Sequence, residues 1–170
     1  MEALVIRREI PRDIPFIHGV NEAAFDTTAE ARLVDALRAA GGVTLSLVAE
    51  ERGEIVGHIL FSPVTIEGRP GIDAVGLAPM AVVPPKQKQG VGSRLVREGL
   101  AELRQRGCAG VVVLGHPRYY PRFGFVPASR FGLRCEYDSP DEAFMALELV
   151  PGALAGASAL VRYRPELSGF

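Results

Sequence analysis

The chain has 170 residues, of which 48% are hydrophobic and 23% are charged, and its formal net charge is −1 at pH 7. This composition is that of a folded globular protein and excludes a disordered chain, and the length predicts a single domain over residues 1–170. Because there is no basic run, nothing favours a nucleic-acid partner. No apolar segment approaches the ~20 residues that a membrane-spanning helix requires, so no membrane partner is expected.

The two cysteines and the first residues indicate where the protein resides. Cys108 and Cys135 are isolated and lack the spacing of metal ligands. We therefore expect reduced thiols, with Cys108 packed as a small apolar residue, and no bound metal. The opening run is strand-like and charged rather than typical of a signal peptide, which favours a cytoplasmic location; it reads Met-Glu-Ala-Leu-Val-Ile-Arg-Arg.

The first 42 residues predict one strand and two helices. Leu4–Ile10 alternates as a strand does, and Asp13 is placed to cap a helix that runs to Phe25. Thr27–Glu30 has the spacing of a capping box for a second helix. Gly41–Gly42 ends that helix.

Three strands are predicted next. Ser46–Glu50 and Ile55–Ile66 form a hairpin around Arg52–Glu54. Ile72–Val83 is a fourth strand, interrupted by Pro79, and a proline inside a strand predicts a bulge that splays the chain.

The second half begins with an amphipathic helix from near Val91 to Gly107, followed by a buried strand over Gly110–Leu114. Because a helix connects them, this strand is expected to lie parallel to the fourth. Later strands are predicted at Leu133–Glu136, Phe144–Val150 and Leu160–Tyr163. The fold class is therefore α/β (α+β), with a mixed, mostly antiparallel sheet flanked by helices.

The junction between the fourth strand and the helix after it is the most informative segment. The pattern Gln87–Gly92 places Gly90 and Gly92 at a helix start, where backbone N–H groups and the helix dipole favour phosphate. The nucleotide P-loop pattern is absent, and Leu95 stands where a dinucleotide fingerprint needs its third glycine. The reading in which the glycines only shape a tight turn stays open.

Two segments together resemble the GNAT acyl-CoA N-acyltransferase superfamily, and in particular its YhbS-like branch of predicted N-acetyltransferases. The first runs from Leu77-Ala78-Pro79-Met80-Ala81-Val82 through Gly90-Val91-Gly92-Ser93 and is similar to the acetyl-CoA-binding motif. The second is Leu114-Gly115-His116-Pro117-Arg118-Tyr119-Tyr120-Pro121-Arg122-Phe123-Gly124-Phe125.

The resemblance implies acetyl-CoA as cosubstrate, held in a gap between splayed fourth and fifth strands. Main-chain groups of Met80, Ala81 and Val82 would bind the pantetheine arm and the thioester carbonyl. Gln89 stands where the family often has Arg or Lys, and Lys86 and Lys88 are the candidates to compensate. The implied pyrophosphate contacts are Lys88, Gln89, Gly90, Val91, Gly92 and Ser93.

The implied reaction is direct attack of a primary amine on the thioester. Tyr120 matches the family tyrosine near the coenzyme sulfur, and we expect it to be the general acid, although an aromatic residue here also serves as a core cap. His116 is a candidate base, because imidazole titrates near pH 7, but a loop histidine is also an ordinary surface residue. Weaker candidate bases are Asp73, Glu30 and Glu136, and a water chain also suffices. His58 stands within an apolar strand, and we expect it to be a hydrogen-bonded core or cleft-wall residue.

The leading function is thus an N-acetyltransferase whose acceptor is a small-molecule amine or a peptide amino group. The alternatives are a non-catalytic acyl-CoA-binding sensor or interaction module, and a nucleotide-binding regulator that uses the same loop. The C-terminal segment allows pairing within its own sheet or with a second copy in a homodimer. Weak acceptor-site candidates are Phe25, Asp26, Tyr137 and Asp138.

Overall fold

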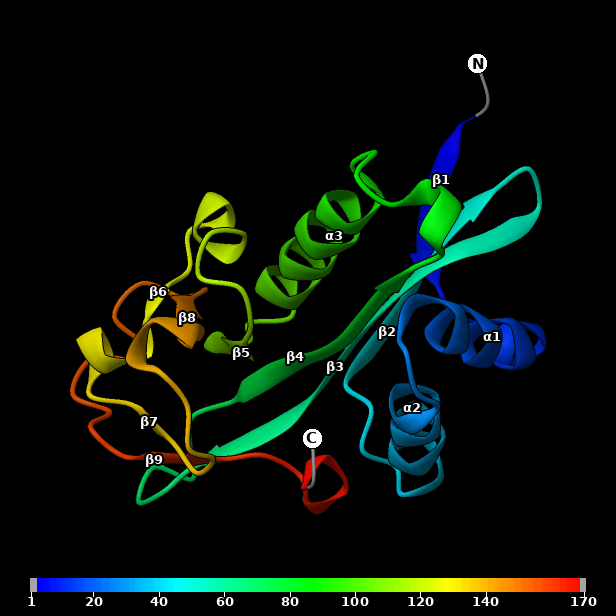
Figure 1. Cartoon of the computed structure of the whole chain (residues 1–170). Helices are drawn as coiled ribbons and strands as arrows, with labels where there is room; N and C mark the ends of the chain where they lie inside the picture. The colour runs from blue at the N-terminus through cyan, green and yellow to red at the C-terminus, as the bar shows by residue number, and fades with distance from the viewer. Residues whose placement is uncertain (1–2, 169–170) are drawn as a thin grey trace. The chain divides into compact units, whose positions relative to one another are not determined.

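The computed structural model describes residues 3–168, which form two compact units (Figure 1). The first unit contains residues 3–61 and 78–99, and the second contains residues 62–77 and 100–168. Strands β3 (Glu54–Ile66) and β4 (Ala74–Val82) and helix α3 (Val91–Gln105) each contribute residues to both units. No helix among the described residues is long and apolar enough to cross a membrane.

The first unit is built on an antiparallel sheet of β1 (Leu4–Arg8), β2 (Leu45–Glu51) and β3. The predicted hairpin between β2 and β3 is confirmed. Its two-residue turn places Arg52 and Gly53 at φ angles of 54° and 77°. Positive φ at both turn residues matches the right-handed twist of the strands, so this turn sets the register of the hairpin.

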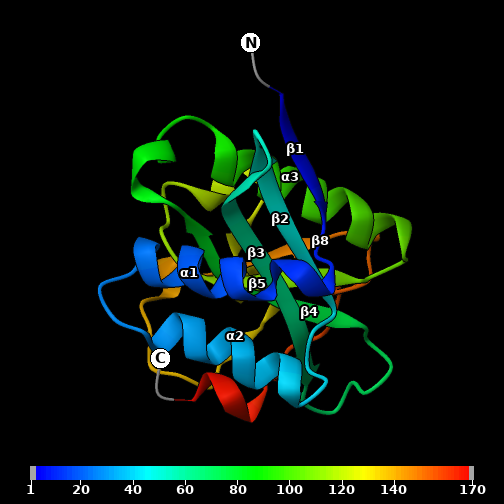
Figure 2. The ribbon, with the colours of Figure 1, turned by 90° about the vertical axis from the view of Figure 1, so that its right-hand side faces the viewer.

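Helices cover both faces of this sheet (Figures 1 and 2). Helices α1 (Ile14–Ala24) and α2 (Ala29–Ala39) lie on one face, and the first part of α3 lies on the other. Gly57 permits the close approach of α3, because a Cβ atom there would lie 3.1 Å from the side chains of both Val91 and Leu95. Since strand residues alternate, the next residue of β3 points toward α1.

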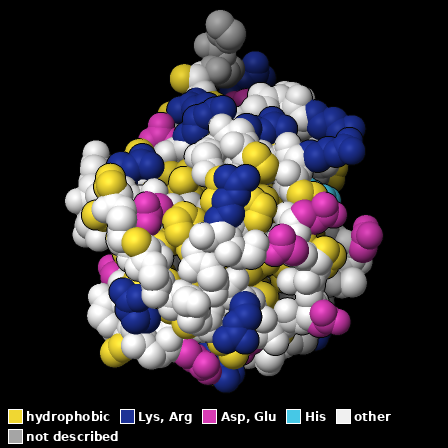
Figure 3. All heavy atoms as spheres, turned by 90° about the vertical axis from the view of Figure 1, so that its left-hand side faces the viewer, with side chains coloured by type: hydrophobic (Ala, Val, Ile, Leu, Met, Phe, Trp, Pro, Cys, Tyr) yellow, Lys and Arg dark blue, Asp and Glu magenta, His cyan; other side chains and the backbone are white. Residues whose placement is uncertain are grey.

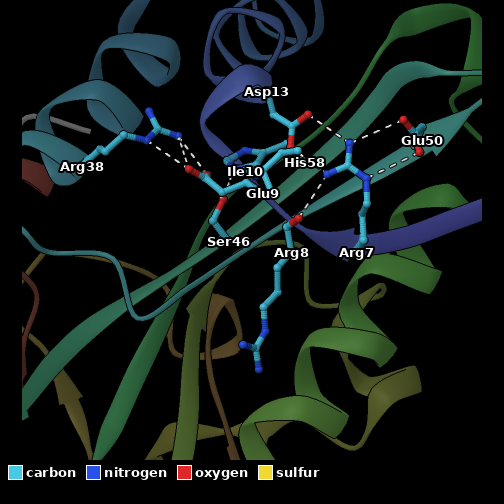
Figure 4. Close-up of polar contacts among 9 residues, drawn as sticks. All are labelled: Arg7, Arg8, Glu9, Ile10, Asp13, Arg38, Ser46, Glu50 and His58. Atoms are coloured by element: carbon cyan, nitrogen blue, oxygen red, sulfur yellow. Dashed lines mark hydrogen bonds and ion pairs between the residues drawn. The ribbon is translucent and has the colours of Figure 1, made fainter.

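Two predicted helix caps form differently from the sequence pattern. Asp13 precedes α1 as predicted, but its carboxylate accepts hydrogen bonds from the Ile10 N–H at 2.8 Å and from Arg7 rather than from a helix amide (Figure 4). The Arg7 hydrogen bond holds the pKa of Asp13 below its usual range. Before α2, the Thr27 hydroxyl accepts from the Ala29 N–H at 3.2 Å, so a local turn replaces the capping box.

The second unit contains the parallel part of the sheet. The start of β4 pairs in parallel with β5 (Gly110–Leu114), and β5 pairs antiparallel with β8 (Phe144–Glu148), which also pairs with β6 (Val126–Pro127). Of the described pairings, those of β4 with β5 and of β7 (Arg134–Cys135) with β9 (Leu160–Arg162) are parallel and the others antiparallel. This confirms the mixed, mostly antiparallel sheet.

A hydrophobic core holds the second unit together. It draws on the end of β3, on β5, on β8, on the segment before β9 and on β9, where Leu154 of that segment and Val161 of β9 are buried. Tyr163 packs on this core so closely that a Cβ atom at Gly76 would lie 2.6 Å from its ring. Gly76 therefore marks a position in β4 where only glycine fits.

The boundaries of the longer elements match their predictions, and the short strands β7 and β9 lie within the predicted ranges. Strand β6 and the 3-10 turns over 11–13, 84–86, 120–123, 128–131, 141–143 and 165–167 were not anticipated. Pro79 was expected to interrupt β4, yet the strand continues through it, with a cis Ala78–Pro79 peptide bond.

Two helical glycines give opposite expectations for stability. A Cβ at Gly99 would lie 2.6 Å from the fully buried Phe61 ring, whereas a Cβ at Gly19 would meet nothing within 4 Å. Gly99→Ala should therefore lower the free energy of unfolding by about 1–3 kcal/mol through overpacking. Gly19→Ala should raise it by about 0.5–1 kcal/mol. Urea denaturation of both variants checks this, and equal effects would contradict it.

Candidate active site

The loop between β4 and α3 has an uncommon backbone. After a 3-10 turn over Pro84–Lys86, the residues 87–90 are exposed, and helix α3 begins at Val91. Gly90 has φ 88°, where glycine fits at little cost, but Lys88 also has a positive φ, of 62°. For a residue with a side chain this left-handed conformation costs roughly 1–2 kcal/mol. Such strain persists only where the surroundings impose it.

Two glutamine side chains hold this loop against its own backbone. Gln87 Nε2 donates to the Val82 carbonyl at 2.9 Å, and Gln89 Nε2 donates to the Pro85 carbonyl at 2.9 Å. Gln89 is the position where a basic residue was expected to be frequent. Here its amide stabilises the loop, a role that the sequence pattern alone did not reveal.

The start of α3 presents main-chain N–H groups. The first helical hydrogen bond that joins the loop to α3 runs from Arg94 N–H to the Gly90 carbonyl, at 3.1 Å. The N–H groups of Val91 and Gly92 precede it and have no acceptor within the helix. The helix dipole adds partial positive charge at the same end. A Cβ at Gly90 would meet nothing within 4 Å, so the space beside it is open.

The basic residues of the loop are not equivalent. Lys86 Nζ lies 2.5 Å from Glu51 Oε1, so its charge is already neutralised by a carboxylate. Lys88 is exposed and, in the described part of the chain, forms no ion pair. The expectation that Lys86 compensates for Gln89 is therefore not supported, and Lys88 is the better anion contact.

The end of β4 determines which main-chain groups point away from β3. The Val83 N–H donates to the Val56 carbonyl of β3 at 3.0 Å. Because the polar groups of successive strand residues point to opposite edges, those of Met80 and Val82 point away from β3, and those of Ala81 point toward it. The parallel ladder with β5 covers only Ala74–Gly76, so it does not extend to these residues.

In the second unit, Tyr120 lies at the start of the 3-10 turn over Tyr120–Phe123 and is 7% exposed. Its ring packs edge-on against Phe125, with centroids 5.6 Å apart, and against Gly115, where a Cβ would lie 2.6 Å from the ring. Burial raises the pKa of Tyr120 to about 12. The phenol thus stays protonated at neutral pH, as a proton donor must.

Tyr119 and His116 have different environments from Tyr120. The Arg122 guanidinium lies 4.5 Å from the centroid of the Tyr119 ring, a cation–π contact that keeps this side chain near the surface. His116 is exposed, and its carbonyl accepts from the Tyr119 N–H at 3.1 Å. His116 therefore shapes the turn through its backbone, while its imidazole faces solvent.

A buried polar network surrounds His58, which confirms the expected hydrogen-bonded core residue, but its partners were not identified from the sequence (Figure 4). His58 is fully buried in β3, with Nε2 2.9 Å from Ser46 Oγ and Nδ1 3.2 Å from Asn21 Nδ2. The Ser46 hydroxyl donates to Glu9, whose carboxylate accepts from Arg38 at 2.9 Å. The only sequence signal was that these polar residues interrupt apolar faces of their strands and helix.

The directions of the hydrogen bonds in this network determine which ring nitrogen of His58 carries the hydrogen. The Ser46 hydroxyl proton goes to Glu9, so Nε2 of His58 carries a hydrogen and donates to Ser46. Nδ1 then accepts from Asn21, which also donates to the Ile17 carbonyl at 3.0 Å. Burial, reinforced by the charge of Arg38, lowers the pKa of His58 to about 3. His58 is a neutral core residue rather than a base.

Comparison with known proteins identifies the family. The profile of the acetyltransferase (GNAT) domain matches residues 43–127. The N-acetyltransferase YhbS of Escherichia coli K12 is 41% identical over 168 residues, which cover 98% of this chain and 100% of the relative. The chain belongs to the GNAT acetyltransferase family. A second GNAT relative, YjhQ of the same organism, is 43% identical over 76% of this chain and 74% of its own length.

Two solved GNAT structures confirm the predicted fold. The crystal structure of Escherichia coli YhbS in complex with CoA has a TM-score of 0.96 and 40% identity, covering 100% of this chain and 94% of that chain. A GNAT acetyltransferase from Brucella melitensis in complex with acetyl-CoA has a TM-score of 0.82 and 40% identity, covering 98% of this chain and 99% of that chain.

The buried His58 predicts how stability depends on pH. The folded pKa lies near 3 and the ordinary value is 6.5. Below pH 6.5 the unfolded chain therefore binds a proton that the native core rejects. The free energy of unfolding should fall by up to about 1.4 kcal/mol per pH unit from this group as the pH drops from 6.5 toward 3. Urea denaturation at several pH values in this range measures the free energy of unfolding. For His58→Gln this free energy should depend less steeply on pH than for the unaltered protein, because the other titrating groups are the same in both. Parallel slopes for the two proteins would contradict the assignment.

Proposed function

We propose that the protein is an N-acetyltransferase that transfers the acetyl group of acetyl-CoA to a primary amine by direct attack on the thioester. Family membership makes it an acetyltransferase, and two relatives with 40% identity were solved with CoA and with acetyl-CoA. The observation that carries the proposal is the start of α3 next to the exposed loop residues 87–90, where main-chain N–H groups and an open space at Gly90 suit a diphosphate.

The proposed coenzyme contacts are those of the sequence analysis, refined by geometry. Met80 and Val82 offer main-chain groups on the edge away from β3, so we assign them to the pantetheine arm and the thioester carbonyl. The inward direction of Ala81 weakens its assignment as a main-chain contact. The proposed pyrophosphate contacts are Lys88, Gln89, Gly90, Val91, Gly92 and Ser93.

In the proposed reaction the neutral amine nitrogen attacks the thioester carbon, the C–N bond forms and the C–S bond breaks. The nitrogen loses a proton and the leaving sulfur gains one, so the products are an N-acetyl amine and the CoA thiol. Tyr120 is the proposed donor to the sulfur, because its buried phenol retains its proton. His116 remains the proposed base, and its exposed imidazole exchanges the proton with water.

We also propose that the two units work as one acyltransferase domain over residues 1–170. The segment matched by the family profile, residues 43–127, takes residues from both units. Cys108 and Cys135 are unpaired thiols, which supports the proposal of a cytoplasmic protein. On the face drawn in Figure 3, Lys and Arg side chains gather mainly in the upper part, and Asp and Glu lie mainly at the right and at the bottom.

The alternative function is an acyl-CoA-binding module without catalysis. Such a module would use the same loop and the same start of α3 to bind the coenzyme. It would differ from the enzyme only because it needs no proton donor. The buried, protonated Tyr120 favours catalysis. Release of CoA thiol in the presence of a broad amine and peptide panel, with mass spectrometry of the product, decides between the two.

Gly92→Val should abolish acetyl-CoA binding while the protein still folds, because the new side chain would occupy the space of a phosphate. Isothermal titration calorimetry with acetyl-CoA measures the affinity. Gly19→Val is the matched control, since it places the same residue in an exposed part of another helix. Wild-type affinity in the Gly92 variant would contradict the phosphate site.

Tyr120→Phe should lower kcat by about 100-fold or more, the usual contribution of a positioned general acid, with little change in the affinity for acetyl-CoA. Steady-state assays of thiol release measure kcat. Tyr119→Phe removes the neighbouring hydroxyl and is expected to retain activity. If the Tyr120 variant kept the wild-type rate, another group would have to protonate the sulfur.

A further inference from the structure

Exposed hydrophobic side chains gather at one place in the first unit, around a hollow of about 640 Å³ between the β2–β3 hairpin and the start of α1. Phe16 is 62% exposed and lines the hollow. Val5 is 45% exposed and lies directly opposite Glu50 of β2, another lining residue. Ile10 is 40% exposed, and its N–H donates to Asp13, which also lines the hollow. A monomeric protein seldom exposes several large apolar side chains together, so this cluster indicates a surface that a partner covers.

Part of the wall of the hollow is a set of charges that are already paired. Arg7 lies 2.7 Å from Asp13 and 3.5 Å from Glu50 (Figure 4). Asp13 is buried, and it accepts two hydrogen bonds from Arg7. A partner that covers this wall therefore leaves none of the three charges without a counter-charge, which is the condition for burying them at tolerable cost.

Two further charges at the hollow have no such partner. Arg12 and Glu54 both line it and are exposed, and within residues 3–168 neither forms a hydrogen bond or an ion pair. The same surface thus carries an unpaired cation, an unpaired anion, a protruding aromatic ring and a hollow. A two-fold axis sets such a surface against itself, and each feature then meets its complement.

Strand pairing does not offer a second copy an alternative way to bind at β1 or β9. β1 has only β2 as a neighbour, and the Glu9 N–H donates to β2, so the carbonyls of Leu4 and Arg8 point to the free edge. These carbonyls accept from Arg94 at 2.7 Å and from Arg7 at 3.2 Å, which blocks the edge. The C-terminal strand β9 is paired with β3 and with β7 of its own chain.

We propose that two copies of this chain form a two-fold symmetric dimer through the Phe16 patch, which consists of Val5, Ile10, Arg12, Phe16 and Glu54. Phe16 of each copy enters the hollow of the other, and Arg12 of each copy pairs with Glu54 of the other. An aromatic anchor in a pocket, with an arginine beside it, is the typical centre of a protein–protein interface. The inference uses the first unit alone and does not depend on the proposed acetyl transfer.

Sedimentation equilibrium of the full chain over a range of concentrations tests the dimer. The mass should rise with concentration to twice that of one chain, and Phe16→Ala should raise the dissociation constant at least roughly tenfold. Val150→Ala is the control, because this valine is also exposed but belongs to the second unit and does not line the hollow. A chain that stays monomeric throughout, or a dimer equally stable in both variants, would overturn the proposal.

An exchange of charges tests the proposed pairing across the two-fold axis. Arg12→Glu and Glu54→Arg should each raise the dissociation constant roughly tenfold or more, because each places like charges opposite one another. The chain that carries both substitutions should regain most of the lost affinity, since every cation again faces an anion. A double variant as weak as the single variants rules the pairing out. Loss of thiol release from a chain that still dimerises would count against the proposed enzyme and not against this interface.

Discussion

The structure depends most on the way in which β4 passes into α3, because this junction exposes main-chain N–H groups at a helix start. The loop that precedes them contains a lysine in a left-handed conformation, which is unfavourable by itself. The side-chain amides of Gln87 and Gln89 hold that conformation through hydrogen bonds to Val82 and Pro85. Preorganisation of this kind lowers the entropy that a ligand must overcome when it binds.

The alternating direction of main-chain groups along β4 also determines what this junction presents. One hydrogen bond from Val83 to β3 determines the edges to which Met80, Ala81 and Val82 present their polar groups. On the other face of the first unit, the network around His58 links both N-terminal helices to β2 and β3. Figure 4 shows the part of it that reaches α2, through Ser46, Glu9 and Arg38. These hydrogen bonds satisfy both ring nitrogens of the buried His58, so a shift of either helix would leave polar groups of the network unpaired.

The sequence allowed the long elements and the position of the glycine loop before α3 to be predicted, because each carries a strong local signal. The apolar period of α3, the valine run of β5 and the Arg52–Gly53 turn all belong to single short segments. The His58 network could not be predicted, since its partners stand 12 and 37 residues away and no pattern links them. The role of Gln89 could not be predicted for a related reason. Its side-chain amide donates to the backbone carbonyl of Pro85 rather than to a ligand, and no sequence pattern indicates such a bond.

Gln89 stands where a basic side chain is frequent, and this changes the forces by which the loop can attract an anion. A lysine or arginine attracts a diphosphate from a distance, and that attraction is screened by salt over about 10 Å at moderate ionic strength. In this loop Lys86 is neutralised and Gln89 is uncharged, so of these three side chains only the exposed Lys88 is left to attract a distant anion. Under the proposed function, recognition then relies mainly on short-range hydrogen bonds, which makes coenzyme affinity less sensitive to ionic strength than it would be with a second cation at position 89.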